Sequence, residues 1–108
     1  MTRIFALFVA LMIASTSASA FDGYVDVTNN TGYDIYYLYV SHAKRKSWGE
    51  DKLGEDVLLN GDTVRIDVRN EKTSVFDIRA EDEDGDTYTI WDLDIEHYDL
   101  ELTLDHLD

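Results

Sequence analysis

Residues 60–69 read NGDTVRIDVR, a turn dipeptide followed by a run in which apolar and polar residues alternate. Asn60-Gly61 is typical of a two-residue hairpin turn, because Asn and Gly readily adopt left-handed backbone conformations. Val64, Ile66 and Val68 fall on one side of a pleated strand, which predicts that this side is buried. The same period of two recurs along the chain, over residues 24–28, 33–41, 57–59, 75–80, 87–95 and 99–104.

These segments predict an all-β domain of six or seven short strands. No window of residues 21–108 keeps apolar spacings of three and four over two helical turns. Without helices to cross between parallel strands, we expect antiparallel pairing, and the apolar faces of the sheets must then meet. The predicted architecture is a small antiparallel β-sandwich of immunoglobulin-like size, with a closed barrel as the alternative.

Two segments add local detail to this prediction. Residues 33–41 (YDIYYLYVS) are apolar on both faces, which is typical of a central strand that is covered on both sides. Trp91-Asp92 interrupts the alternation within residues 87–95, and this shift predicts a β-bulge.

The first 20 residues have the pattern of a secretory signal peptide. Arg3 precedes an unbroken apolar run over residues 4–14, and residues 18–20 (ASA) form a small-residue cleavage site. The run is shorter than the about 20 residues that a membrane-spanning helix needs. The sequence therefore predicts a cleaved signal peptide over residues 1–20 and a domain over residues 21–108. We expect a periplasmic or secreted product that is not held at a membrane after cleavage.

The composition excludes several classes of protein. The 108-residue chain has 23 Asp and Glu against 9 Lys and Arg, a formal net charge of −14. This charge argues against binding to nucleic acid or to an anionic membrane. The chain has no Cys, which excludes disulfides, thiolate metal sites and cysteine nucleophiles. Stability must come from the core, from backbone pairing or from a bound ion.

Several motifs occur in an order that resembles a known group of proteins. They are VTNNTG at residues 27–32, YLYVS at 37–41, WGED at 48–51, and FDIRA at 76–80 followed by Asp84-Gly85. With these motifs the chain resembles a family of small secreted bacterial β-domains without an established activity. The motifs belong to turns and strands, so the resemblance implies a fold and carries over no functional residues.

An acidic segment over residues 81–86 (EDEDGD) is a candidate cation site. Asp82, Asp84 and Asp86 have the spacing of calcium ligands in a loop, and calcium takes six to eight oxygen ligands. The segment lacks the Gly and Glu positions of an EF-hand loop. The alternative is a solvated hairpin tip in which Asp84-Gly85 forms the turn. We expect no cofactor other than the Ca²⁺ that this segment would bind.

The longest irregular stretch is residues 42–54, and the loop over residues 42–56 that contains it is a candidate contact region. It holds the basic run Lys44, Arg45 and Lys46, and then Trp48. Long loops often carry binding residues, so this segment predicts a docking site. The alternative is that the charges compensate one another and that a buried Trp48 fixes the loop to the domain.

The absence of common catalytic motifs favours a protein without catalytic activity. The three His residues do not form H-x-H or H-E-x-x-H, and no G-x-S-x-G is present. We expect a non-enzymatic interaction or structural module with a protein or glycan partner. The sequence does not determine the oligomeric state. The alternatives are a calcium-binding module and a carbohydrate-binding module. The second would use four tyrosines of one predicted strand, which otherwise belong to the core: Tyr33, Tyr36, Tyr37 and Tyr39.

Overall fold

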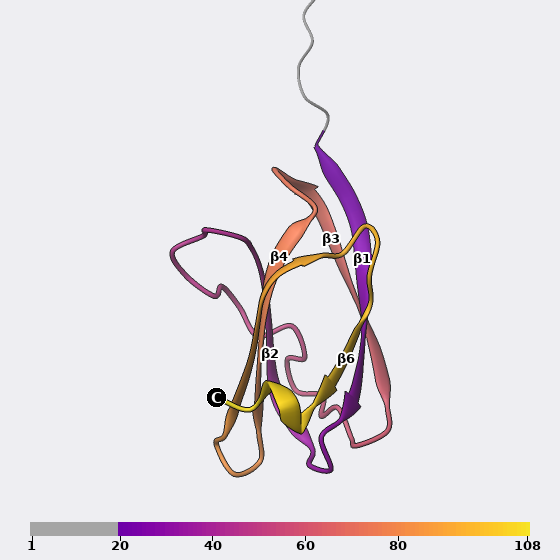
Figure 1. The fold of residues 1–108 in the computed structure, drawn as a ribbon, viewed down its shortest axis with the longest axis vertical. Helices are drawn as coiled ribbons and strands as arrows, with labels where there is room; N and C mark the ends of the chain where they lie inside the picture. Colours follow the sequence, from indigo (N-terminus) through magenta and orange to yellow (C-terminus); the bar gives the residue numbers. More distant parts are fainter. Residues whose placement is uncertain (1–19) are drawn as a thin grey trace, which may run out of the picture.

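The computed structural model describes residues 20–108, which form six strands and one short 3-10 helix (Figure 1). The elements are β1 (Phe21–Asn30), β2 (Ile35–His42), β3 (Thr63–Glu71), β4 (Val75–Asp82), β5 (Thr87–Asp94), β6 (Leu100–Thr103) and η1 (Leu104–His106). The prediction of an all-β chain is confirmed for these residues. The predicted signal peptide falls on residues 1–20, of which 1–19 lie outside the described residues.

The strands form two three-stranded sheets, with the orders β3-β1-β6 and β2-β4-β5. The pairs β1–β3, β2–β4 and β4–β5 are antiparallel. Residues that sequence alternation assigns to one face lie opposite one another, as Val25 lies opposite Ile66 and Val40 opposite Ile78. The apolar faces of cross-strand neighbours therefore coincide, as a buried sheet face requires.

The expectation of purely antiparallel pairing is wrong for one pair. β6 lies parallel to β1, with Val27 opposite Leu100 and Asn29 opposite Leu102. Parallel neighbours need a crossover connection, which is usually a helix. Here β5 of the other sheet precedes β6, so the chain returns to β1 after passing through the second sheet. Strands supply the crossover, and no helix is required.

The expectation that residues 33–41 form a central strand is also wrong, because β4 is central and β2 lies at an edge. A register shift between Ile35 and Tyr37 explains the apolar residues on both faces of β2. It turns Ile35, Leu38 and Val40 toward the core and leaves Tyr37 exposed. A bulge thus produced a pattern that resembles a strand covered on both sides.

Residues 50–58 cover the free edge of β2. The backbone N–H of Leu38 donates to Asp51 Oδ1 (2.9 Å), and the Lys52 N–H donates to the carbonyl of Leu38 (2.7 Å). Ile35 and Leu58 exchange two backbone hydrogen bonds of 2.9 Å. The strand edge therefore has backbone partners on this side, which limits its pairing with other chains.

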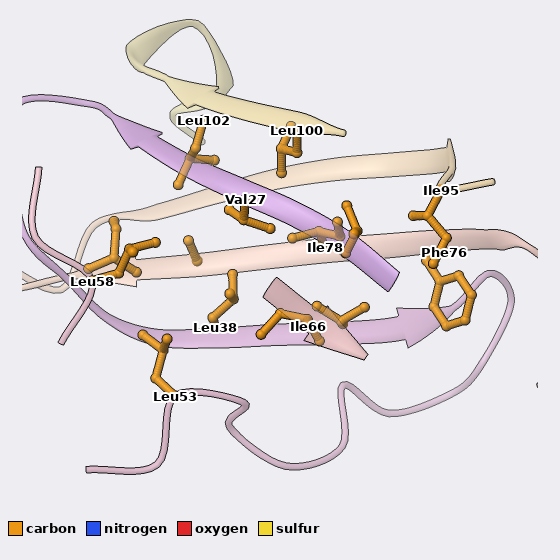
Figure 2. Packing of buried hydrophobic residues seen from close by; sticks show 14 of the residues in the cluster. Val27, Leu38, Leu53, Leu58, Ile66, Phe76, Ile78, Ile95, Leu100 and Leu102 are labelled. Atoms are coloured by element: carbon orange, nitrogen blue, oxygen red, sulfur yellow. The ribbon is translucent and has the colours of Figure 1, made fainter. Parts of the chain in front are cut away.

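Side chains from both sheets form one apolar cluster (Figure 2). Figure 2 shows Val27, Ile66 and Leu102 of one sheet pointing to the same interior as Leu38 and Ile78 of the other. Leu53 and Leu58 from the segment between β2 and β3 join this cluster. Burial of each large apolar side chain stabilises the fold by about 1.5–3 kcal/mol, so this shared interior is the main source of stability.

Asn29 is a buried polar residue that joins three parts of the backbone. Its side chain is fully buried, and Nδ2 donates to the carbonyls of Tyr33 (2.7 Å) and Leu58 (3.0 Å). Its Oδ1 accepts from the backbone N–H (3.1 Å) and the hydroxyl (2.8 Å) of Thr31. This amide uses both donors and both acceptor positions, so the β1–β2 turn is fixed against the segment that leads into β3.

We expect Asn29→Asp to lower the free energy of unfolding by about 3 kcal/mol, because the carbonyls of Tyr33 and Leu58 would lose their donors and face a carboxylate. Urea unfolding measures the change. Asn60→Asp is the matched control, since the side chain of exposed Asn60 accepts from the Gly32 N–H (2.8 Å) and Asp retains that acceptor. Equal losses in the two variants would contradict the role of the Asn29 amide.

Candidate functional site

The outward face of the β2-β4-β5 sheet carries polar and aromatic side chains. Phe76, Ile78 and Ala80 of β4 are buried in the core, so the intervening residues Asp77 and Arg79 lie on the outward face. Asp77 is opposite Ser41 of β2, and Arg79 is opposite Tyr39 of β2 and Thr89 of β5. Cross-strand pairing therefore assembles this face from residues that are distant in the sequence.

A β-bulge in β5 lies opposite Asp77, as predicted from Trp91-Asp92. The register of β4 and β5 shifts between Phe76 and Ile78, and Asp92 has a left-handed backbone with φ of 57°. Asp77 Oδ1 accepts a hydrogen bond from the Asp92 N–H at 2.9 Å. The carboxylate thus satisfies a backbone donor that the bulge removes from the ladder.

The second oxygen of Asp77 has no such partner. Asp77 is only 8% exposed, and no group within residues 20–108 donates to its Oδ2. A buried acceptor without a donor costs about 1–3 kcal/mol. An acceptor that has no donor in the protein is free to accept a hydrogen bond from a bound group.

Trp48 lies over the same face. The Ser41 hydroxyl donates to the Ser47 carbonyl at 3.0 Å, which holds the loop against the end of β2. The Trp48 and Trp91 ring centroids are 5.7 Å apart with a 43° tilt, and the Arg79 guanidinium carbon is 5.0 Å from the Trp48 ring centroid. Trp48 is half-buried and Trp91 is 63% exposed, so the pair presents an aromatic surface to solvent.

A cavity of about 170 Å³ opens beside the two indoles. It lies between the outward sheet face and the first part of the β2–β3 segment, which stands out at the left in Figure 1. Its lining residues are Ser41, Arg45, Lys46, Ser47, Trp48, Asp77 and Trp91. The cavity therefore combines two aromatic rings, one buried carboxylate and two cationic side chains.

The structure brings together three of the four contact residues predicted from the sequence: Trp48, Arg45 and Lys46 line this cavity. Lys44 is exposed and lines a separate hollow with Val75 and Asp92. Sequence reasoning missed Asp77 and Trp91. The predicted bulge was the available signal, because bulges often re-aim side chains beside functional sites.

The acidic hairpin between β4 and β5 is built around Asp82. Asp82 is 3% exposed; its Oδ1 accepts from the backbone N–H of Asp84 and of Asp86, each at 2.9 Å, and its Oδ2 accepts from the Tyr88 hydroxyl at 2.8 Å. Burial, followed by the hydrogen bond to Asp82, raises the pKa of Tyr88 to about 12, so Tyr88 stays protonated as a donor. Asp84 and Asp86 point to solvent as exposed residues. The Asp82 carboxylate thus has three donors from its own hairpin.

Another group of metal-ligating side chains lies between β5 and β6. Within residues 20–108, Asp94, Glu96 and His97 are the group of three whose ligand atoms fall within 4.8 Å of one another. Asp94 already accepts from His97 Nδ1 (2.8 Å), the Ser74 hydroxyl (2.9 Å) and the Glu96 N–H (3.1 Å). The hydrogen bond with Asp94 raises the pKa of His97, and the same bond is the main cause that lowers the pKa of Asp94. This arrangement caps the start of the β5–β6 connection.

The four tyrosines of the sugar-binding alternative are not core residues. Tyr33, Tyr36 and Tyr37 are exposed, and Tyr39 is half-buried. Tyr37 and Tyr39 share the outward sheet face with Arg79, on the same side as the Trp48–Trp91 pair. The exposed aromatic surface therefore extends from the cavity along β2.

Comparison with protein-family models gave no match, and neither curated proteins nor solved structures gave one. The resemblance to small secreted bacterial β-domains therefore stays a prediction. Over residues 20–108, the chain forms no helix with the length and apolar character needed to cross a membrane.

We expect Asp82→Ala to destabilise the fold by about 3 kcal/mol, because it leaves two hairpin N–H groups and the buried Tyr88 hydroxyl without an acceptor. Thermal melts with millimolar calcium or with chelator should show the same loss. Asp84→Ala is the control and should stay within about 0.5 kcal/mol, as is usual for an exposed position. A rise in the melting temperature of the unmodified chain with calcium would instead favour the calcium-site hypothesis.

The Asp94–His97 pair should make stability depend on pH. The folded pKa of His97 is raised above 6.5, so the contribution of the pair is complete below pH 6.5 and is lost as pH rises through the folded value. Urea unfolding of the native chain and of His97→Gln, from pH 5 to pH 9, measures this difference. If the free energies of unfolding of the native chain and of His97→Gln differ by the same amount at every pH, the raised pKa of His97 is contradicted.

Proposed function

We propose that this chain is an exported, non-catalytic binding protein that recognises its partner through the Trp48–Trp91 face. The observation that carries the proposal is an exposed Trp91 in contact with Trp48 at the mouth of a partly buried polar cavity. Large exposed aromatics gain most from being covered, and Trp and Arg dominate the energetics of interfaces. We refer below to Trp48, Trp91, Arg45, Lys46 and Asp77 as the indole cavity.

We further propose that the two sheets face each other as a β-sandwich. The shared apolar cluster supports this arrangement, because both sheets bury one face in it. The opposite face of β2-β4-β5 then stays free for contacts. In this view the sandwich is a rigid support, and the loop after β2 shapes the binding surface.

Export is the second part of the proposal. The signal-peptide pattern of residues 1–20 supports it, and cleavage after Ala20 would leave a chain that begins at Phe21, the first residue of β1. We infer a periplasmic or secreted location. The partner is a protein or a glycan, and nucleic acids and anionic membranes are disfavoured by the net charge of −14.

The chemistry of the cavity favours binding over catalysis. Among its lining residues Asp77 is the carboxylate, and the Ser41 hydroxyl is used to hold the Ser47 carbonyl. These groups offer stacking, hydrogen bonds and positive charge. Covalent catalysis needs a nucleophile that is hydrogen-bonded to a base, and among these lining residues no hydrogen bond joins a Ser hydroxyl to Asp77 or Lys46.

Affinity capture with the processed chain tests the proposal. The exported product should begin at Phe21 by mass spectrometry, and this product, immobilised, should retain a partner from the extracellular and envelope fractions of the source cells. Trp91→Ala should reduce the retained amount at least tenfold, because it removes half of the exposed aromatic pair.

Tyr98→Ala is the matched control for this experiment. Tyr98 is 65% exposed, close to the 63% of Trp91, but it lies in the β5–β6 connection away from the indole cavity. Capture should survive this change. Equal loss in both variants, or no loss in Trp91→Ala, would overturn the proposed role of the Trp48–Trp91 face.

A further inference from the structure

We propose that the indole cavity holds an acidic pyranose, namely a uronic-acid residue of a glycan. This inference rests on the proposed function and names the ligand class of the same site. Three properties of the cavity carry it: its size, the free oxygen of Asp77, and the excess of positive charge around two indole rings.

The size of the cavity fits one ring. Sites for drug-sized ligands usually measure about 300–1,000 Å³. The indole cavity measures about 170 Å³ and is open on one side, which suits a single sugar residue of a longer chain. Neighbouring residues of the glycan would then extend over the exposed face of Trp91 and along Tyr37 and Tyr39 of β2.

Asp77 requires a ligand that donates hydrogen bonds. Asp77 is 8% exposed and lines the cavity, its Oδ1 accepts from the Asp92 N–H, and no group of residues 20–108 donates to its Oδ2. A sugar hydroxyl is a donor of the right kind, and a hydrogen bond to a charged group contributes about 1.5–3 kcal/mol. A fully ionised phosphate or sulfate ion carries no donor, so Asp77 would repel it.

The two indoles require a ligand with an apolar face. Aromatic rings carry negative charge on their faces, which attracts groups with partial positive charge. The axial C–H groups of a pyranose form such a face. The Trp48 and Trp91 rings contact each other at a 43° tilt. They therefore form one shallow concave surface on which a sugar ring can stack, and they do not enclose the ring between parallel faces.

The charge of the site favours an acidic sugar over a neutral one. Arg45 and Lys46 line the cavity, and Arg79 lies against the Trp48 ring. The chain has nine Lys and Arg residues against 23 acidic residues. Four of the nine are in or near this site: Lys44, Arg45, Lys46 and Arg79. The lining itself holds two cations, Arg45 and Lys46, against the Asp77 carboxylate, and this excess disfavours a cationic ligand. Arg79 lies outside the lining, with its guanidinium 4.0 Å from the Asp108 carboxylate. A uronate carboxylate pairs well with a guanidinium, which can hold both of its oxygens.

Calorimetry and tryptophan fluorescence with defined oligosaccharides test the inference. The probes are tetramers of galacturonate and of mannuronate, each compared with the same tetramer after its carboxylates have been reduced to alcohols. We expect at least one uronate tetramer to bind and to shift the Trp emission. Its reduced form should bind at least tenfold more weakly, because the Arg45 and Lys46 charges would lose their partner.

Asp77→Asn separates recognition from folding. The amide oxygen can still accept from the Asp92 N–H, while the free oxygen becomes an NH₂ group that cannot accept from a hydroxyl. Uronate affinity should fall at least tenfold with no decrease in melting temperature. Asp84→Asn, at an exposed position of the β4–β5 hairpin, is the control and should bind as the native chain does.

The outcomes distinguish the two proposals. If Trp91-dependent capture persists but neither uronate tetramer binds, the glycan inference is overturned and the proposed function stands. If the reduced tetramers bind as tightly as the uronates, or if Asp77→Asn binds unchanged, the inference is also overturned. If capture does not depend on Trp91 and no tetramer binds, both proposals fail.

Discussion

Three buried polar side chains hold the backbone of this chain where small exported domains often use disulfides. Asn29 joins the β1–β2 turn to the segment that leads into β3, Asp82 closes the β4–β5 hairpin, and Asp77 supports the bulge in β5. Each of them satisfies backbone groups that the sheet ladders leave unpaired. In a chain with a net charge of −14 and no Cys, these hydrogen bonds limit how far the turns can open.

Asp77 differs from the other two in a way that bears on function. The Asn29 amide and the Asp82 carboxylate have their polar atoms paired within residues 20–108, whereas one Asp77 oxygen has no donor in this part of the chain. Asp77 lies at the position where the aromatic pair and the basic side chains meet. A site that lacks one donor in the free protein gains affinity and selectivity when the ligand supplies it.

Period-two alternation predicted the strands because each strand buries one face, and it placed Ile66 and Val68 correctly in the core. Alternation does not encode which strands become neighbours. Alternation could therefore not predict that β6 pairs with β1 in parallel or that β2 lies at a sheet edge. The same limit applies to the site: Trp48, Arg45 and Lys46 stood out within one loop, but Asp77 and Trp91 join them only through pairing of β4 with β5. The interrupted alternation at Trp91-Asp92, which predicted a bulge, was the sequence feature that pointed to this part of the site.

The segment between β2 and β3 is divided into two parts with separate anchors. Residues 50–58 cover the edge of β2, whereas residues 45–48 line the cavity. The segment 43–49 is held by the Ser41 hydroxyl on the Ser47 carbonyl and by the Ala43 N–H on the Val75 carbonyl. Changes of length or composition in residues 43–49 would therefore leave the edge of β2 covered. This short stretch is the natural point for grafting and for diversification of specificity, much as variable loops are exchanged on a constant scaffold.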